Sequence, residues 1–398
     1  MQAGKFIEQF RPQEPKAWHR LAASLGMFIL GTVFASWAAR IPDVQANLGL
    51  SNAELGYALF ATPLGQFIAM MITPSLVRRF SSRRVALTAM LLHPAVLIAL
   101  GAAGDGRMLF AVLMLFGVCY SLLSISVNTQ ALQVENLYQR SIMAKVHGCW
   151  SMGGVLGGLA GGVMAGLHVP PVWHFTLIFV LAVFCARFCS RHFMQEDLKK
   201  PSQGSVRRWQ MPDAILLVLG AVGFGSMLVE GAMYNWNSVY FVSVLGEDGF
   251  SARSGYLSCM LLMVCARFVA DGFINRYGEI PVLRVSALSM AAGLALLVFS
   301  PGYTCAVVAS GFVGFGMAAV VPICYSMAGR LSTVSPAAAI SMVCAISFLG
   351  FLMGPPVIGA LSDVFTLRGA FVAVLLSPVI IGGLSFVLAG RAADAKRN

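Results

Sequence analysis

Twelve long apolar runs constrain what this chain can fold into more than any other feature of its sequence. A helix of about 20 apolar residues is long enough to cross a bilayer, because each residue adds about 1.5 Å. With 58% hydrophobic and only 11% charged residues, the chain cannot cover a water-facing surface with polar side chains. We therefore predict an all-α membrane protein with twelve transmembrane helices. The predicted spans cover residues 18–40, 56–77, 85–104, 108–134, 143–167, 172–193, 213–241, 255–275, 280–300, 303–329, 337–361 and 369–390.

The basic residues are distributed unequally between the two ends of these spans. Arg40, Arg107, Arg253 and Arg368 fall on one side of the predicted membrane, and Arg267 falls inside a span. The rest of the 27 Lys and Arg residues fall on the other side. Because loops rich in Lys and Arg stay in the cytoplasm, we predict a multi-pass protein of the bacterial inner membrane with both termini cytoplasmic. This topology also explains the net charge of +11, so we expect no nucleic acid as a partner.

One connection differs from the others, because residues 194–212 are polar and basic and contain two prolines. This segment joins six spans to six. We predict one six-helix bundle over residues 1–193, a cytoplasmic linker over 194–212, and a second six-helix bundle over 213–398. The halves repeat weakly with an offset of about 196 residues, which predicts a 6+6 pseudo-two-fold arrangement with a substrate site between the bundles. The matched positions are Ser151, Gly154 and Gly158 with Ser347, Gly350 and Gly354.

A basic motif lies between spans two and three, where residues 74–85 read PSLVRRFSSRRV. It resembles the inter-helix motif GxxxDRxGRR of the major facilitator superfamily. Arg79, Arg83 and Arg84 match the basic positions of that motif, although Arg78 replaces its Asp. Together with the twelve spans and the repeat, the motif implies the major facilitator fold and a secondary transporter that works by alternating access.

Longer stretches in both halves indicate one branch of that superfamily. The chain is similar over nearly its whole length to the YbjJ-like transporters, which are related to the fucose permeases. In that branch an Asp is common at the positions held here by Ser124 and Asn235, so this chain either lacks proton coupling or couples through another residue. The matching stretches are ASWAARIPDVQANLGLSNAELG (35–56), VNTQALQVE (127–135), VHGCWSMGG (146–154), EGAMYNWNSVYF (230–241), GFLMGPPVIG (350–359) and LRGA (367–370).

Span seven carries a carboxylate near the middle of the membrane. An acid at this depth costs about 2.5–3.5 kcal/mol on insertion scales, so Glu230 is predicted to be functional and to be the main proton-coupling residue. Tyr234 and Asn237 follow at i+4 and i+7 on the same helical face, with Trp236 nearby. We predict that these four residues form a wall that binds substrate. The alternative is a structural hydrogen bond between Glu230 and a neighbouring helix.

Span four and the start of span five supply further polar candidates. Tyr120 and Asn128 lie on one helical face, and we predict that both contact the substrate. Interhelical hydrogen bonding is the alternative for Asn128. His147 opens span five and titrates near neutral pH in water, so it is a second candidate for proton coupling, or else a structural residue at a helix end.

Charged residues near the span ends are candidate gates. Arg40 and Asp43, three residues apart at the outer end of span one, predict an outer gate or a site for an anionic group, with an ordinary surface pair as the alternative. Arg267 and Asp271 are four apart on span eight and can pair on one helical face. The resemblance implies that such residues hold the cytoplasmic ends of the halves together. The predicted cytoplasmic gate consists of Arg79, Arg83, Arg267 and Asp271.

The favoured function is uptake or export of a small polar solute, sugar-like or a related metabolite, coupled to protons as symport, by a monomer in the lipid bilayer. The alternative is export of amphipathic drugs or metabolites, since 21 Met and 27 Phe residues can form adaptable apolar walls. A membrane sensor that does not transport is a second alternative. Sequence patterns of hydrolases and nucleotide-binding sites are missing, and the nine cysteines form no CxxC pair. We therefore expect no enzymatic activity, no cofactor and no metal site.

Overall fold

The computed structural model describes residues 15–138, 142–195, 213–299, 302–331 and 336–397, and these residues are helical almost throughout. The first six helices are α2 (Pro15–Leu48), α3 (Asn52–Phe80), α4 (Ser82–Gly101), α5 (Gly106–Tyr138), α6 (Met143–Gly166) and α7 (Pro171–His192). The remaining helices are α8 (Ala214–Ser243), α9 (Ser251–Tyr277), α10 (Glu279–Val298), α11 (Tyr303–Met317), α12 (Val320–Leu331) and α13 (Pro336–Arg397).

These helices make twelve membrane crossings within the described residues. Helices α2 to α10 cross once each, and α11 and α12 form a single crossing that is interrupted at Ala318 and Ala319. Helix α13 bends at Thr366, whose backbone is not helical (φ 68°, ψ 161°), so it provides the last two crossings. By length and composition alone, ten helical stretches qualify as spans. Helix α13, which makes two crossings, is one of these ten stretches, and the glycine-rich α6 is not among them, so twelve crossings result. The predicted fold class, all-α with twelve transmembrane helices, is confirmed.

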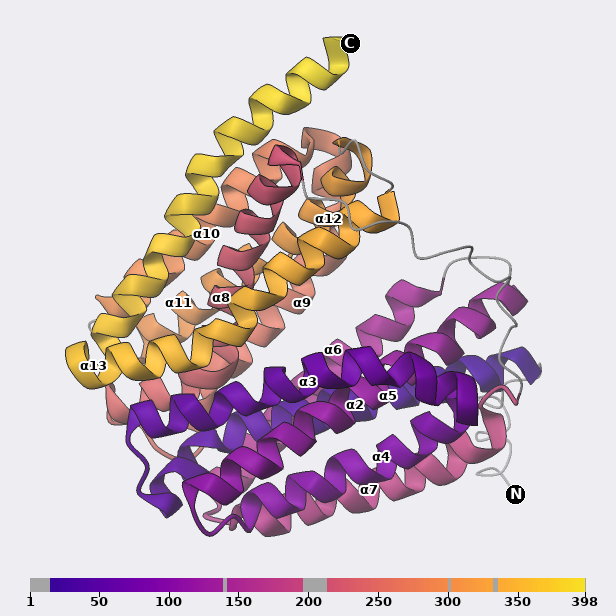
Figure 1. Ribbon diagram of the computed structural model, residues 1–398. Coiled ribbons are helices and arrows are strands. Elements are labelled where there is room, and N and C mark those ends of the chain that lie inside the picture. The colour runs from indigo at the N-terminus through magenta and orange to yellow at the C-terminus, as the bar shows by residue number, and fades with distance from the viewer. Residues whose placement is uncertain (1–14, 139–141, 196–212, 300–301, 332–335, 398) are drawn as a thin grey trace, which may run out of the picture.

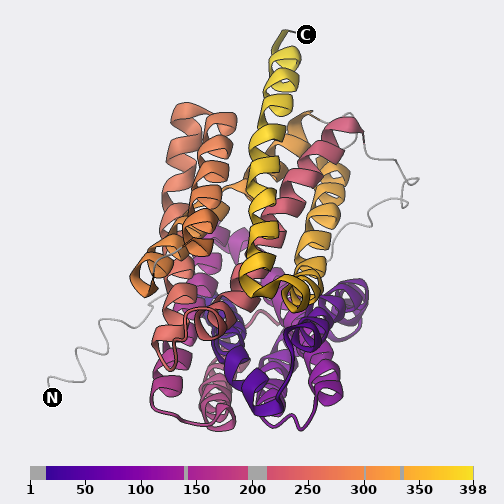
Figure 2. The same cartoon turned by 90° about the vertical axis from the view of Figure 1, so that its left-hand side faces the viewer.

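The helices gather in two bundles (Figure 1). Helices α2 to α7 lie together in one bundle, and α8 to α13 lie together in the other. A second view shows the same division (Figure 2). Residues 196–212, which include most of the predicted linker, lie outside the described residues. The bundles touch at one end and diverge toward the other in Figure 1.

The two bundles repeat the same close helix contacts. A Cβ atom built at Gly117 of α5 would lie 1.9 Å from the carbonyl oxygen of Thr62, and one at Gly314 of α11 would lie 2.0 Å from that of Cys259. Both residues of the second contact lie 197 positions after those of the first. Helices in a bilayer associate through such small residues, because lipid is as apolar as the helix surface and close packing must replace the hydrophobic effect. The weak repeat in the sequence therefore reflects conserved helix spacing within each bundle.

Glycines also let the bundles meet at one end. A Cβ atom at Gly56 of α3 would lie 2.7 Å from the carbonyl oxygen of Pro355 and 3.0 Å from the Cα atom of Gly359, both in α13. A Cβ atom at Gly249, before α9, would lie 3.1 Å from the Cα atom of Gly166 of α6. We call this the closed end, and the opposite one, where the bundles diverge, the open end. The cavity described below is bounded by the closed end.

The first prediction concerns helix packing. Gly117→Ala should lower the apparent melting temperature in detergent by several degrees, because its methyl group overlaps the backbone of α3 and overpacking costs about 1–3 kcal/mol. The higher helix propensity of Ala offsets at most about 1 kcal/mol of this cost. Gly383→Ala is the matched control, since a Cβ atom there meets nothing within 4 Å. Equal melting temperatures for the two variants would contradict the packing account.

Candidate functional site: a cavity between the bundles and its closed end

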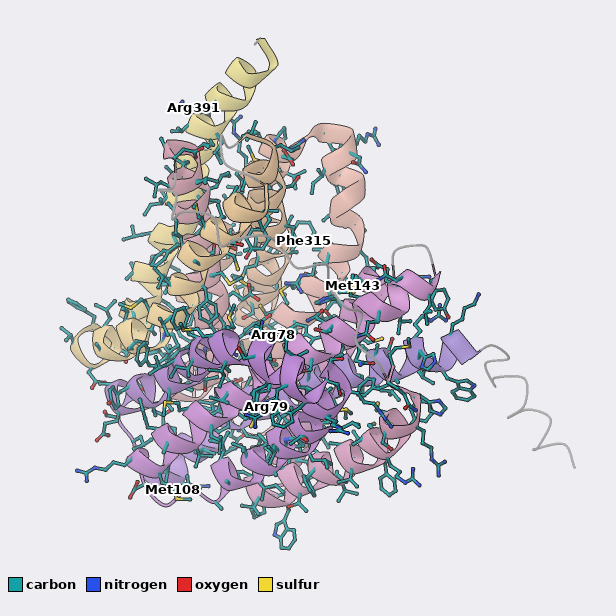
Figure 3. The ribbon with its side chains drawn as sticks, turned by 45° about the vertical axis from the view of Figure 1, so that its right-hand side comes forward. Arg78, Arg79, Met108, Met143, Phe315 and Arg391 are labelled. Atoms are coloured by element: carbon teal, nitrogen blue, oxygen red, sulfur yellow. The ribbon has the colours of Figure 1, made fainter. Side chains whose placement is uncertain are left out.

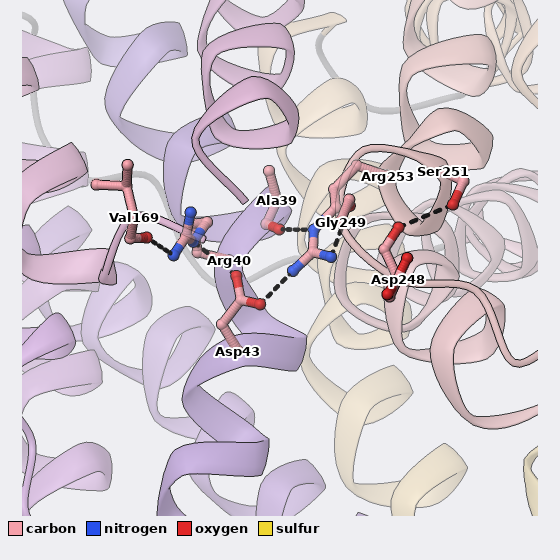
Figure 4. A network of polar contacts seen from close by, with 8 residues as sticks. All are labelled: Ala39, Arg40, Asp43, Val169, Asp248, Gly249, Ser251 and Arg253. Atoms are coloured by element: carbon pink, nitrogen blue, oxygen red, sulfur yellow. Dashed lines mark hydrogen bonds and ion pairs between the residues drawn. The ribbon is translucent and has the colours of Figure 1, made fainter. Parts of the chain in front are cut away.

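A buried charge network joins the bundles at the closed end (Figure 4). The side chain of Arg253, at the start of α9, is only 2% exposed. Its guanidinium donates to the carbonyl oxygen of Ala39 at 2.9 Å and to that of Gly249 at 2.8 Å, and its Nη2 lies 2.5 Å from Oδ1 of Asp43. Because Ala39 and Asp43 belong to α2, one arginine of the second bundle is held by two groups of the first.

Asp43 holds a second guanidinium at the same point. Nε of Arg40 lies 2.6 Å from Oδ2 of Asp43, and its Nη2 donates to the carbonyl oxygen of Val169, in the loop before α7. Arg40 and Asp43 were proposed from sequence as a gate, and the structure adds Arg253 as the partner across the bundles. Opposite charges removed from water must be well paired to be tolerated, and these two guanidinium groups share one carboxylate. Any opening of this end must break the contact between Asp43 and Arg253.

An aromatic layer, here called the aromatic floor, lies next to this network on the side of the open end. The ring of Tyr234 (α8) lies 5.7 Å from Phe34 (α2), 6.2 Å from Tyr256 (α9) and 6.5 Å from Phe351 (α13), in edge-on arrangements. Phe34 also lies 5.7 Å from Tyr120 of α5. Edge-to-face packing at these separations stabilises aromatic pairs beyond the area they bury. The layer therefore seals the space between the bundles with rings from five helices.

A cavity of about 280 Å³ lies toward the open end, between α6 of the first bundle and α9 and α12 of the second. His147, which is exposed, is held by a 3.1 Å hydrogen bond between its Nε2 and Oδ1 of Asn128 of α5. The first bundle thus presents an imidazole and an amide as a pair to the cavity. Its lining includes His147, Trp150, Ser151, Arg267, Phe268 and Pro322.

Glu230 lies close to this cavity on the second bundle. It is half-buried and precedes Tyr234 by one helical turn on α8. Its charge acts on Tyr120 and Tyr234, and so does the charge of Arg267. The phenol of Tyr234 contacts the sulfur of Met263 of α9 at 3.8 Å, within the aromatic floor. The carboxylate therefore lies just beyond the floor, on the side of the open end.

Two residues of the predicted substrate wall lie elsewhere. Asn237 is fully buried and donates from Nδ2 to Oγ of Ser310 of α11 at 3.0 Å. Trp236 is also fully buried and packs against Gly56 at the closed end. In this conformation neither residue lines the cavity, and their contact with substrate stays a prediction. Residues i+4 and i+7 share a helical face with Glu230, but α8 passes from the cavity into the sealed end after Tyr234, so the same face becomes buried.

Of the residues expected to form a cytoplasmic gate, the three with described side chains, Arg79, Arg83 and Arg267, do not meet one another across the bundles. Arg79, on the first bundle (Figure 3), lies with its guanidinium 5.2 Å from the ring of Phe80 beside it. Arg83 donates to the carbonyl oxygen of Ser190 at 2.5 Å and so ties α4 to α7 within one bundle. Arg267 lines the cavity, and the side chain of Asp271 lies outside the described part of the chain. A gate at the open end would therefore form only in another conformation.

Two bundles of six crossings around a cavity that carries His147, Ser151 and Arg267 (hereafter the polar cavity), closed at one end, define a membrane transport protein. A family model described as Major Facilitator Superfamily matches residues 22–305, so the chain belongs to that superfamily. It is 32% identical over 363 residues to an uncharacterized transporter, y4wD, of Sinorhizobium fredii, with 90% of this chain and 94% of that protein covered. It is 28% identical over 353 residues to the membrane protein MosC of Rhizobium meliloti, with 89% and 86% covered.

Solved structures share the same fold. A variant of the nucleoside transporter NupG matches with a TM-score of 0.76 at 13% identity, covering 94% of this chain and 99% of that one. A D-xylose–proton symporter matches with a TM-score of 0.69 at 14% identity, covering 93% and 95%. At these identities the likeness concerns the arrangement of the helices, and it agrees with the family match.

The second prediction concerns the closed end. Asp43→Asn leaves two guanidinium groups without a carboxylate and should raise the share of molecules open at this end by roughly tenfold, which corresponds to about 1.4 kcal/mol. The measurement is the rate at which a maleimide labels Ala53→Cys, placed where α3 meets α13. Asp105→Asn is the control, because Asp105 caps α5 within one bundle. Labelling that is no faster in Asp43→Asn than in the control would contradict the role of the network.

Proposed function

We propose that this protein is a proton-coupled secondary transporter of a small polar solute, sugar-like or a related metabolite, in the bacterial inner membrane. The observation that carries the proposal is the position of Glu230, half-buried one helical turn from Tyr234, near a cavity whose lining includes Arg267 and His147, with His147 hydrogen-bonded to Asn128. A carboxyl group, an amide and an imidazole form a hydrogen-bonding set that suits a hydroxyl-rich ring. Tyr120 and Tyr234 supply aromatic surface against which such a ring can stack.

The proposed orientation places the closed end in the periplasm and both termini in the cytoplasm. The basic residues favour it, because most Lys and Arg residues fall at the open end. The cavity then faces the cytoplasm, and transport requires the network of Arg40, Asp43 and Arg253 to part while the open end closes. The motifs at 35–56 and 230–241 further favour membership of the YbjJ-like branch, related to the fucose permeases.

Proton coupling is assigned to Glu230, with His147 as a possible second site for the proton. A carboxylate wetted in one conformation and shut away from water in the other is costly to leave charged, so protonation accompanies closure. Within the described residues, Glu230 is the acid beside the cavity, whereas Glu135 binds backbone amides of the α5–α6 connection. The positions where relatives carry Asp hold Ser124 and Asn235, and the Asn235 amide donates to the carbonyl oxygen of Gly231.

The third prediction tests this assignment. Glu230→Gln in proteoliposomes should abolish accumulation driven by a pH gradient while leaving exchange of solute across the membrane, because the variant cannot bind and release a proton at this position. The solute is chosen beforehand by a thermal-shift screen of the purified protein. Glu247→Gln, in the loop before α9, is the control. Accumulation at the wild-type level in Glu230→Gln would point instead to His147 or to a facilitator, and binding without any transport would indicate a sensor.

A specific observation favours the second candidate function, export of amphipathic compounds. An apolar groove of about 380 Å³ lies between α9, α10 and α11, and it shares Ala270, Ala318 and Ala319 with the polar cavity. Ala318 and Ala319 form the break between α11 and α12, where the wall between the two spaces consists of small side chains. A solute with a polar head and an apolar tail could occupy both spaces. The apolar lining of the groove includes Val269, Phe273, Val285 and Phe315.

The fourth prediction separates the two candidates. Val269→Trp fills the groove with an aromatic side chain and lies away from the polar cavity. Export of an amphipathic fluorescent dye from vesicles should fall several-fold if the groove holds its tail, whereas exchange of a polar solute should change by less than about twofold. Leu288→Trp, on the exposed surface of α10, is the matched control. Under the favoured function, both substitutions leave transport of the polar solute intact.

A further inference from the structure

Two opposite charges, on Glu230 and Arg267, lie near the same pair of tyrosines and form no ion pair with each other. Glu230 lies four residues before Tyr234 on α8, and Arg267 lies four residues after Met263 on the adjacent helix α9. Because the Tyr234 phenol contacts the Met263 sulfur, both charged side chains lie about one turn, roughly 5.4 Å, from that contact toward the open end. Both act electrostatically on the same two tyrosines. Among the described residues, neither takes part in an ion pair.

The guanidinium of Arg267 needs a partner of opposite charge when the cavity closes. In the present conformation its side chain is exposed, so water solvates the guanidinium. Closure of the open end removes that water, and a guanidinium deprived of water needs an anionic partner. Its facing groups on α6, His147 and Ser151, offer hydrogen-bonding atoms but no negative charge. Among the side chains that the structure describes, the partner must therefore be Glu230 or a group that enters with the solute.

The surroundings of Glu230 hold no second charge that could change this balance. The titratable groups on which its charge acts are phenols and a thiol, residue types that ordinarily carry no charge at neutral pH. They are Tyr120 of α5, Tyr234 of α8, Cys259 of α9 and Tyr325 of α12, with Cys344 of α13 hydrogen-bonded to Tyr325. Helices α2 and α11, which also pack against α8, contribute Phe34 and Ser310. With His147 neutral, the described side chains leave the charge of the closed cavity to Glu230, Arg267 and the cargo.

We propose that the solute carries one negative charge, that Arg267 binds its anionic group, and that the solute displaces Glu230, which then takes up a proton. This inference rests on the proposed proton coupling at Glu230. Only two balanced states of the closed cavity fit that coupling. The empty carrier closes with Glu230 ionised against Arg267, and the loaded carrier closes with the anion against Arg267 and Glu230 protonated.

Other cargoes break this balance. A neutral solute together with a proton leaves the charge of Arg267 uncompensated, and a cation does the same. An anion without a proton leaves one surplus negative charge. A neutral solute or a zwitterion without a proton is balanced, but it would move independently of pH. Coupling at Glu230 therefore selects small organic monoanions, such as a sugar acid, and moves one proton with each.

The test measures closure of the open end in the full-length protein in lipid nanodiscs. Val264→Cys, on the cavity wall, reports closure as protection from alkylation, in a background where Cys149 and Cys265 are Ser. Without solute, Glu230→Gln and Arg267→Gln should each be alkylated several-fold faster than the parent at pH 8. The double variant should return to within about twofold of the parent, because it again has no surplus charge.

Solute pools then identify the cargo. A pool of small carboxylates, including glucuronate, should restore protection in Glu230→Gln, which imitates the protonated state. A pool of neutral polyols, including glucose, and a pool of amines, including glucosamine, should not restore it. Protection by polyols or amines but not by carboxylates would overturn the inference, as would unchanged protection in both single variants. The inference would also be overturned if Asp271→Asn alone raised the alkylation rate as much as Arg267→Gln does, because Asp271 would then be the partner of Arg267.

The alkylation and solute-pool results also separate failure of the monoanion inference from failure of the proposed transport function. If neutral polyols bind the parent protein and cross the membrane independently of pH, transport stands and the monoanion inference falls. If no pool and no change of pH alters alkylation of the parent, the protein does not alternate between conformations, and the proposed function itself fails.

Discussion

The contact between Asp43 of one bundle and Arg253 of the other is the interaction on which the rest of this structure depends. It brings a nearly fully buried guanidinium against α2 and holds the two bundles together at one end. With that end fixed, the divergence of the bundles produces a cavity that opens on one side only. The aromatic floor around Tyr234 completes the seal between the charge network and the cavity.

The contact between Asp43 and Arg253 can break and form again during transport. Both guanidinium groups also bind backbone carbonyl oxygens, Arg40 that of Val169 and Arg253 those of Ala39 and Gly249. The carboxylate of Asp43 remains 27% exposed, so water can replace the lost partner when the bundles part. A fully buried pair would be far costlier to break. The closely packed glycines nearby, Gly56 and Gly359, meet through backbone surfaces, which can separate without unlocking interdigitated side chains.

The number and placement of the helices followed from the sequence because the bilayer demands about 20 apolar residues for each crossing. The break at Ala318 and Ala319 and the bend at Thr366 fall inside or between predicted spans without changing their number. Contacts between helices were harder to infer. Arg253 was recognised only as a basic residue on the outer side, because a partner 210 positions away leaves no periodic signal.

The sequence predicted which side chains share one face of a helix better than it predicted whether those side chains are buried or reach the cavity. The spacing of Glu230, Tyr234 and Asn237 gave a common face, yet that face runs from the cavity through the floor into buried contact with Ser310. The spacing of four gave Arg267 a place on the same helical face as Asp271, but it did not show that Arg267 lines a cavity with His147 and Trp150 of the other bundle. A spacing rule describes a single helix, and the neighbouring helices decide whether its face meets water, substrate or another side chain.

The central claim is that the two bundles rock about the cavity, so that one end opens as the other closes. The most direct measurement is the distance between pairs of spin labels at both ends of the protein in lipid nanodiscs. One pair joins Gln45 of α2 to Glu247 before α9 at the closed end, and the other joins Ser75 of α3 to Arg276 of α9 at the open end. The account predicts two populations whose distances change reciprocally, with Asp43→Asn enriching the one that is long at the first pair and short at the second. A single fixed distance at either pair, or both distances lengthening together, would contradict it.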